Sequence, residues 1–368
     1  MPKAPAHIAA RVEKFQARIR EAGLDGALVI NHTDIRYLTG FIGEASWAFF
    51  PAKGSSVWII SDGRFKSHIP EEAPHAEVII RARNKTFESH EEAFLRVLGK
   101  KYPKVGVNIA HLDHGSYLRV EKRIGKKNLV AFADGLAKQR SVRDAVELKA
   151  TKKAVAVAQQ AFLDLKKFVK PGMTELEVCA YLEYRMKCLG STEPAFGTIV
   201  AVDGHASHNH AIPGNLKVGK NSSVLIDFGA TVDGYKSDIT RILNFGKPKA
   251  HIQKIHAICL EAMAACEAAI KPGVTLAVAD KAARDVIESY GYTLDHGIGH
   301  GVGLNIHEHP FIGKTNDIVF EEGMVVTIGP GIYLDDKGGC RVENDYLVTA
   351  KGCKSLVNMP KDWEFTLV

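Results

Sequence analysis

The chain of 368 residues is 46% hydrophobic and 24% charged, which is typical of a globular protein with one large domain or two ordinary ones. Its formal net charge is only +6, and its lysines and arginines form no stripe interleaved with aromatic residues, so we expect no nucleic-acid partner. No uncharged apolar run is long enough to span a bilayer, and residues 1–15 lack the apolar core of a signal peptide, so we expect no membrane association. The six cysteines form no C-x-x-C pair, which favours reduced thiols and a cytoplasmic location.

The first part of the chain has the pattern of an α/β domain with a mixed sheet. Residues 8–22 are amphipathic with a helical period, and the polar stretch 88–98 also predicts a helix. Short apolar runs predict strands at residues 27–30, 47–50, 57–60, 78–80 and 105–107. We expect Trp47, Phe49 and Phe50 to lie in the core of this domain rather than at a dimer surface.

A polar link at residues 138–144 leads into a long helix at 145–169, so we expect domains at 1–140 and 141–368. The second domain contains an internal repeat, because K-P-G-M-T at 170–174 recurs as K-P-G-V-T at 271–275, an offset of 271 − 170 = 101 residues. Each copy follows an Ala-rich helix and opens another helix at a threonine, a good N-cap residue. The repeat predicts two similar α+β halves related by a pseudo-two-fold axis, with a cleft between their sheets.

Two aspartates flank a tight turn in the first half. Asp227 ends the apolar run 224–226, and Asp238 follows the turn signal Asp233-Gly234 in a second alternating run. Two antiparallel strands joined by this turn would direct both carboxylates to one face. Buried carboxylates that lie close together are costly unless a cation neutralises them, so the pair is a candidate divalent-metal site. Ordinary edge or turn aspartates remain the alternative.

Histidines form two clusters in this domain. His205, His208 and His210 lie in one polar loop, where a surface loop without function is the alternative to metal binding. The second cluster is the glycine-rich stretch 296–310, with His300 and His307, where glycines would let the backbone approach a ligand closely. Two further strands with a hairpin are predicted over 324–333 and 339–345, and Glu343 lies in the second. Carboxylates with one imidazole suit manganese, iron, cobalt or zinc.

These motifs together resemble the pita-bread metallopeptidases, the family of methionine aminopeptidase, aminopeptidase P and prolidase. The C-terminal motifs are D-F-G-A, S-D-I-T-R, G-H-G-V-G-L with H-E-x-P, P-G-I-Y and R-V-E, in that order. The runs R-Y-L-T-G-F at 36–41 and S-D-G-R-F at 61–65 are similar to the N-terminal domain of the Xaa-Pro branch. The implied fold is a creatinase/prolidase-like α/β domain followed by a pita-bread α+β catalytic domain.

The resemblance implies a role for seven residues. Asp227, Asp238, His300 and Glu343 would be metal ligands, with Asp238 and Glu343 bridging two ions. His210 and His307 would hydrogen-bond the reacting amide, and Arg341 would be the substrate-site arginine beside the last ligand. We count His210, His307 and Glu343 as the catalytic candidates.

One position departs from the family pattern. The family strand has T-I-E-P-G, in which the glutamate is a ligand and the general base, whereas this chain has T-I-G-P-G with Gly329 at that place. Glu321 and Glu322 lie on the same segment but do not match the position. The activity is therefore either weakened, or another group or a single-metal site replaces the missing glutamate.

The resemblance implies metal-dependent hydrolysis of Xaa-Pro bonds at the N-terminus of short peptides, by a dipeptidase or an aminopeptidase. One or two divalent ions are expected, with manganese the first choice and zinc, cobalt or iron the others. The expected assembly is a homodimer. Two alternatives remain: a metal-free hydrolase of a small amide compound, as in creatinase, and a peptide- or protein-binding relative without catalysis.

Overall fold

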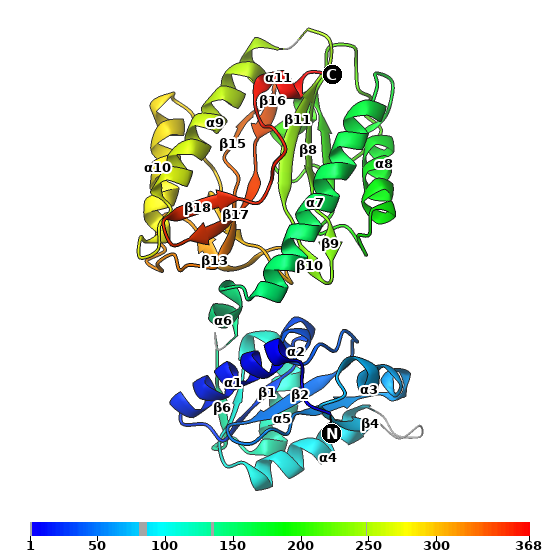
Figure 1. The fold of residues 1–368 in the computed structure, drawn as a ribbon, viewed down its shortest axis with the longest axis vertical. Helices are drawn as coiled ribbons and strands as arrows, with labels where there is room; N and C mark the ends of the chain where they lie inside the picture. Colours follow the sequence, from blue (N-terminus) through cyan, green and yellow to red (C-terminus); the bar gives the residue numbers. More distant parts are fainter. Residues whose placement is uncertain (1, 81–86, 134–135, 248) are drawn as a thin grey trace. The chain divides into compact units, whose positions relative to one another are not determined.

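The computed structural model describes residues 2–80, 87–133, 136–247 and 249–368 (Figure 1). The chain divides into two compact units, Met1–Gln139 and Arg140–Val368. Within the described ranges, every helix is too short or too polar to span a lipid bilayer.

The first unit contains one six-stranded mixed sheet with the strand order β4-β3-β2-β1-β5-β6. Its strands are β1 (Gly26–Val29), β2 (Trp47–Pro51), β3 (Trp58–Ser61), β4 (Glu77–Ile80), β5 (Val105–Val107) and β6 (Leu129–Ala131). Its helices are α1 (Ala6–Glu21), α2 (His32–Thr39), α3 (His68–Glu72), α4 (Phe87–Lys101) and α5 (His114–Ile124), and α6 (Ala137–Ser141) follows. The predicted helices and strands of this unit are confirmed. Phe49 and Phe50 are fully buried in its core, whereas Trp47 is only partly buried and packs against it.

The second unit consists of two halves that each pair two long helices with strands. The first half contains α7 (Ala145–Phe168), α8 (Glu175–Cys188), β7 (Ile199–Val202), β8 (Ser223–Phe228), β9 (Thr231–Val232), β10 (Tyr235–Lys236) and β11 (Ile239–Asn244). The second contains α9 (Ala250–Ala269), α10 (Leu276–Ser289), β12 (Gly299–Gly301), β13 (Glu308–Ile312), β14 (Val325–Ile328), β15 (Gly331–Leu334), β16 (Gly338–Arg341), β17 (Asn344–Thr349), β18 (Gly352–Ser355) and α11 (Trp363–Thr366). Figure 1 shows the two helix pairs on opposite sides of the strands. Each half has its own buried apolar cluster.

The internal repeat is confirmed by matched hydrogen bonds. Gly172 N donates to Val218 O (2.7 Å), and Gly273 N donates to Phe320 O (2.9 Å), so the acceptors are offset by 320 − 218 = 102 residues. Thr174 and Thr275 are the N-cap residues of α8 and α10, as expected. Only Thr174 caps its helix with its side chain: Thr174 Oγ1 accepts from Glu177 N (3.1 Å), and the Glu177 side chain accepts from Thr174 N (2.7 Å) in a capping box that the second copy lacks.

The prediction of two strands over 324–333 and 339–345 is wrong in its boundaries. Each run is divided in two: β14 and β15 are separated at Gly329-Pro330, and β16 and β17 at Val342-Glu343. Pro330 has no N–H to continue the ladder, so the chain changes partner there. β14 pairs with β17 in the main sheet, whereas β15 and β16 form a separate hairpin.

Arg241 on β11 forms hydrogen bonds with the segment that carries Glu343. The side chain of Arg241 is 1% exposed. Its guanidinium donates to Thr240 O and Glu343 O (both 2.9 Å), to Asn344 Oδ1 (2.8 Å), to Pro360 O (3.0 Å) and to Met359 O (3.1 Å). Burial lowers the pKa of Arg241 to about 10, so the charge is retained at neutral pH.

Arg241→Lys should lower the free energy of unfolding by about 2–4 kcal/mol, because an ammonium group cannot reach all of these acceptors and leaves buried carbonyls unpaired. Chemical denaturation measures the change. Arg185→Lys in the same unit is the control, because Arg185 makes a partly exposed ion pair with Asp164 (2.6 Å) that contributes about 1 kcal/mol or less. Equal losses in the two variants would contradict the role of Arg241.

His256 on α9 should make the protein sensitive to acid. Its ring lies 5.4 Å from that of Trp363, and burial lowers its pKa from 6.5 to about 4. The unfolded imidazole therefore takes up a proton below about pH 6.5, whereas the folded one resists protonation down to about pH 4. The His256 contribution is present above pH 6.5 and is lost between these values, by about 3 kcal/mol at most. In urea titrations at pH 7 and pH 4.5, wild type should lose more stability on acidification than His256→Phe, which has an aromatic ring that cannot take up a proton. Equal losses in the two proteins would contradict this assignment.

Candidate metal centre

The two aspartates lie on neighbouring strands of the first half. β8 and β11 pair antiparallel with Asp227 opposite Thr240, and Asp238 precedes Thr240 by two residues, so both carboxylates are on one face. The segment that connects β8 to β11 contains the short antiparallel strands β9 and β10. Asp233 (φ 51°) and Gly234 (φ 81°) form the turn between these two strands. Positive φ at both central residues is the geometry of a type I′ hairpin turn, so the predicted turn is confirmed. The two aspartates are diagonal neighbours rather than directly opposite.

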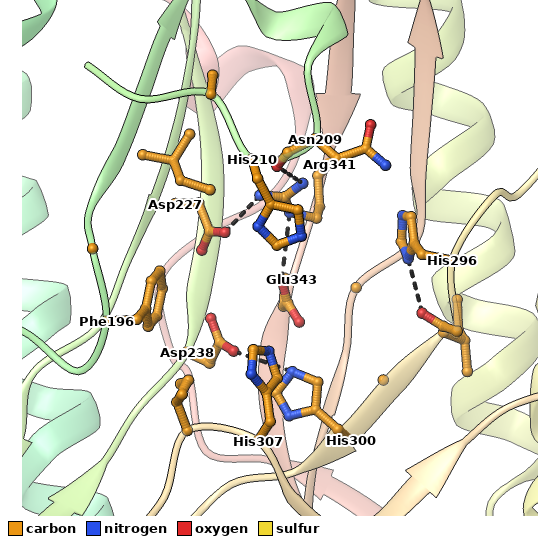
Figure 2. A pocket seen from close by; sticks show the side chains of 18 of the residues that line it. Phe196, Asn209, His210, Asp227, Asp238, His296, His300, His307, Arg341 and Glu343 are labelled. Carbon is orange, nitrogen blue, oxygen red and sulfur yellow. Dashed lines mark hydrogen bonds and ion pairs between the residues drawn. The ribbon is translucent and has the colours of Figure 1, made fainter.

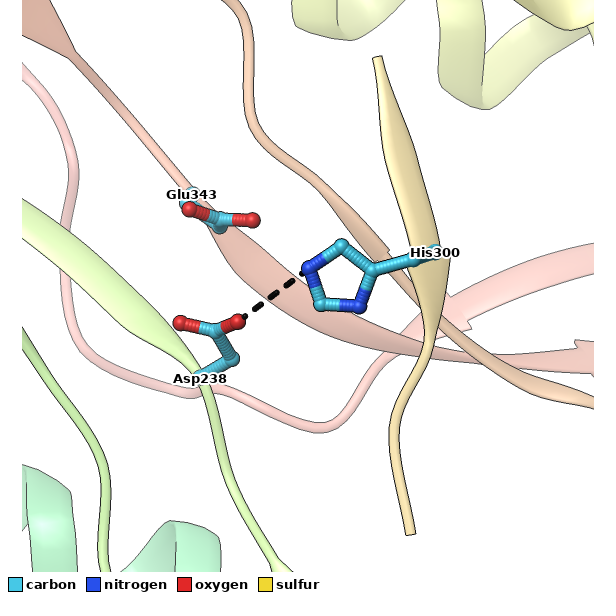
Figure 3. Close-up of side chains that lie close together, drawn as sticks. All are labelled: Asp238, His300 and Glu343. Carbon is cyan, nitrogen blue, oxygen red and sulfur yellow. Dashed lines mark ion pairs between the residues drawn. The ribbon is translucent and has the colours of Figure 1, made fainter. Parts of the chain in front are cut away.

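The second half supplies a histidine and a glutamate to the same place. His300 lies on β12, and Glu343 lies between β16 and β17, bridged to Thr240 of the first half. One donor atom each from Asp238, His300 and Glu343 lies within 4.8 Å of the other two (Figure 3). His300 Nδ1 lies 3.1 Å from Gly301 O, to which it can donate, and this leaves the lone pair of Nε2, 3.5 Å from Asp238 Oδ2, available to a cation. The backbone thereby presents the imidazole lone pair to the carboxylates.

Asp227 is not part of this trio and is paired with Arg341. Arg341 Nη2 donates to Asp227 Oδ2 (2.5 Å), while Asp227 Oδ1 is buried and has no hydrogen-bond partner among the residues that the structure describes. Arg341 Nε donates to Thr240 Oγ1 (3.1 Å), which in turn donates to Glu343 Oε2 (3.1 Å). The arginine therefore orients two of the carboxylates, and one buried oxygen of Asp227 remains available as a ligand.

Burial and mutual repulsion disfavour the charged forms of these acids. Burial raises the pKa of Asp238 well above its usual value, and the nearby Glu343 and Asp227 raise it further. Burial also raises the pKa of Asp227, although Arg341 opposes the shift. Asp345 is a fourth buried acid that the sequence analysis missed: burial raises its pKa, and its Oδ2 accepts from Asp238 N (3.1 Å). Its place in the alternating run after Glu343 was the only available signal.

The donor set fits a divalent metal ion. It combines carboxylate oxygens with one imidazole nitrogen, which suits first-row divalent ions. The unpartnered Oδ1 of buried Asp227 is the atom that such an ion would satisfy. A divalent cation would also remove the repulsion that raises the pKa of Asp238.

A cavity of about 650 Å³ opens onto these residues (Figure 2). Its lining includes all seven predicted site residues: His210, Asp227, Asp238, His300, His307, Arg341 and Glu343. The rings of His300 and His307 lie 4.3 Å apart in an edge-to-face arrangement. Burial, and then the neighbouring His300, lower the pKa of His307. Sequence analysis missed Tyr333, whose hydroxyl accepts from Arg341 Nη1 (2.5 Å), and the lining residue Phe196.

A buried glutamate fixes each of the two segments that carry the substrate-site histidines. Glu175 accepts from Val202 N (2.8 Å) and Gly214 N (2.9 Å), at the two ends of the loop that contains His210, and from His205 Nδ1 (2.8 Å). Of the three histidines in that loop, His205 thus helps to fix the loop through Glu175. Among the described residues that line the cavity, His210 is the only one of the three.

Glu308, next to His307, accepts hydrogen bonds from Arg140 and Arg143 and from Asn305 N (3.2 Å). Burial opposes ionisation of Glu308, but the two arginines hold its pKa below the usual value. His210 and His307 therefore lie on segments that buried glutamates hold in place through hydrogen bonds.

Gly329 allows the Glu343 carboxyl group to approach the backbone closely. A β-carbon added at Gly329 would lie 2.5 Å from Glu343 Cδ, 2.6 Å from Oε1 and 2.8 Å from Oε2. The Glu343 carboxyl group thus occupies the space that the first side-chain atom of any other residue at position 329 would need. Glu321 and Glu322 are not among the described residues that line the cavity, so neither replaces the missing carboxylate.

Comparisons with known proteins agree with the motifs. Residues 149–350 match the model of metallopeptidase family M24, and residues 11–142 match the creatinase/prolidase N-terminal domain. An uncharacterized peptidase of Bacillus subtilis (strain 168), YqhT, is 32% identical over 96% of this chain and 99% of its own.

Two solved structures resemble the whole chain. The Xaa-Pro dipeptidase from Bacillus anthracis has a TM-score of 0.91 and 31% identity, covering 98% of this chain and 100% of that one. The X-Pro aminopeptidase from Thermotoga maritima MSB8 has a TM-score of 0.85 and 30% identity, covering 94% of this chain and 99% of that one. The predicted two-domain fold is confirmed. With the family model matching most of the second unit, the chain belongs to metallopeptidase family M24 and is a hydrolase of the peptidase class.

Proposed function

We propose that this chain hydrolyses Xaa-Pro bonds at the free N-terminus of peptides, with a divalent metal ion held by Asp238, His300 and Glu343. The observation that carries the proposal is the approach of their donor atoms to within 4.8 Å of one another, in a cavity that His210 and His307 also line. Residues 1–140 would form the N-terminal domain and 141–368 the catalytic domain. The Xaa-Pro dipeptidase and X-Pro aminopeptidase among the similar structures support this substrate class.

A divalent ion in this site would supply a Lewis acid that polarises the scissile carbonyl and lowers the pKa of water. Asp227 would contribute its free Oδ1, since Arg341 already occupies the other oxygen. The imidazole groups of His210 and His307 face the cavity without being part of the trio, so they would hydrogen-bond the amide that reacts. Charge that develops on the carbonyl oxygen would be stabilised by these donors.

The proton acceptor is the part of the mechanism that Gly329 changes. Loss of a positioned general base reduces a rate by a factor of about 10² to 10⁴. Glu343 Oε1 is our candidate replacement, because the carboxyl group of Glu343 fills the space beside Gly329 and its other oxygen, Oε2, is engaged by Thr240. We therefore expect a slow peptidase that works with one metal ion per chain.

Metal content and turnover measured on one sample test this proposal. After dialysis against manganese, the wild type should retain a single ion per chain and hydrolyse Xaa-Pro peptides slowly. Asp238→Asn should lose both properties, because a neutral amide is a weaker ligand and no longer offsets the charge of the ion.

Asp233→Asn is the matched control on the same hairpin. Asparagine tolerates the positive φ of that turn position, so metal content and turnover should match the wild type. Two ions per chain with rapid turnover would contradict the single-metal form of the proposal. No metal and no turnover would overturn the proposal in favour of a metal-free hydrolase or a binding protein.

Gly329→Glu should raise the metal content toward two ions per chain and increase turnover by about 10²-fold or more, because it returns a carboxylate that can serve as ligand and base. Glu343 must rotate first, since its carboxyl carbon lies 2.5 Å from the new β-carbon position. Gly329→Gln is the control of equal size without the charge, and it should stay at a single ion. Identical metal contents in the two variants would show that a carboxylate at position 329 does not act as a metal ligand.

A further inference from the structure

The cavity offers no free permanent positive charge among its described lining residues. Arg341 is the one lysine or arginine that lines it, and all three of its side-chain nitrogens are engaged. Nη2 donates to Asp227 (2.5 Å), Nη1 to the Tyr333 hydroxyl (2.5 Å) and Asn209 O (3.3 Å), and Nε to Thr240 (3.1 Å). The guanidinium is therefore committed to orienting the site's own carboxylates.

The histidines that line the cavity also have other partners or proposed roles. His300 belongs to the metal-binding trio, and His210 and His307 have the proposed role at the reacting amide. The remaining one, His296, has its Nδ1 2.8 Å from Gly297 O and its Nε2 3.4 Å from the Tyr333 hydroxyl. A negative charge on a substrate, such as the carboxylate of a dipeptide, would thus meet no side-chain cation of its own in the part of the cavity that the structure describes.

The cavity instead has an apolar collar formed by Phe196, Ile212, Ile306 and Phe311. Ile212 is 83% exposed and Phe311 is 54% exposed, so both have apolar surface that a substrate could cover. Phe311 on β13 is the cross-strand partner of His300 on β12, and paired residues lie on the same face of the ladder. The collar therefore reaches the immediate neighbourhood of the proposed metal site.

We propose that the substrates of this site are peptides of three or more residues with an apolar residue after the proline, and that free Xaa-Pro dipeptides are poor substrates. This inference rests on the proposed Xaa-Pro peptidase function. A dipeptide would place its carboxylate in the cavity without a cationic partner, and an unpaired buried charge is costly. In a longer peptide an uncharged amide takes that position, and the next side chain packs against the collar.

Initial rates with three peptides on manganese-loaded wild-type protein test the inference: Leu-Pro, its C-terminal amide, and Leu-Pro-Leu. The amide removes only the charge, and the tripeptide adds the apolar residue. We expect kcat/KM for the amide to exceed that for Leu-Pro by about tenfold or more, and kcat/KM for Leu-Pro-Leu to be at least as high as for the amide. Leu-Pro-Asp should be cleaved more slowly than Leu-Pro-Leu.

A matched pair of variants tests the physical reason. Phe311→Lys places a cation beside His300, and Phe311→Met has a side chain of similar length without charge. The lysine variant should lower KM for Leu-Pro relative to its amide, and the methionine variant should not. The same response in both variants would overturn the explanation by a missing cation.

The outcomes separate this inference from the proposed function. Hydrolysis of Leu-Pro at least as fast as its amide and Leu-Pro-Leu would overturn the inference and leave the Xaa-Pro peptidase intact. Absence of hydrolysis of all three peptides would overturn the proposed function, and the inference with it. Hydrolysis of the amide and the tripeptide with little of the dipeptide would establish both.

Discussion

The second unit depends on one electrostatic constraint, the placing of several carboxylates in a small buried volume. Asp227, Asp238, Glu343 and Asp345 are all buried, and burial raises the pKa of both Asp238 and Asp345 well above the usual value. Isolated charges in such a place would either take up protons or move apart. Arg341 and Thr240 supply part of the compensation through hydrogen bonds, and the unpartnered oxygen of Asp227 shows that the compensation by protein groups is incomplete.

The surrounding structure keeps these groups close against their repulsion. Arg241 on β11 donates five hydrogen bonds, of which two, to Glu343 O and Asn344 Oδ1, reach the segment around Glu343, so the carboxylates from the two halves cannot separate without breaking buried contacts. A similar device holds the histidines: Glu175 accepts from backbone N–H groups on both sides of His210, and Glu308 accepts from Asn305 N, two residues before His307. Preorganisation of this kind means that little reorganisation is needed when a substrate binds. The price is a set of buried charges that contribute to specificity of the site more than to stability.

Local patterns were sufficient to predict much of this structure. The strands of the first unit, the Asp233-Gly234 turn and the two aspartates on one face follow from hydrophobic alternation and turn chemistry, which act over a few residues. The order of the motifs also indicated which residues would line one cavity.

What could not be predicted depends on contacts between distant segments. Nothing near Arg341 indicates that it pairs with Asp227, 114 residues away in the sequence. The division of 324–333 into two strands depends on the partner that each part finds, and the separate roles of His205 and His210 depend on Glu175, which lies on another element. The motif shows that Gly329 departs from the family pattern, but the approach of the Glu343 carboxyl group to it arises only in the folded structure.

The internal repeat has a consequence for how the centre relates to folding. The first half contributes Asp227 and Asp238, the second contributes His300 and Glu343, and each half is built on a core of its own. Neither half alone contains a complete donor set. A ligand that requires donors from both halves binds only when they are docked, and it stabilises that docked state in proportion to its affinity and concentration. A metal ion at this centre would therefore hold the two similar halves together as well as take part in the reaction.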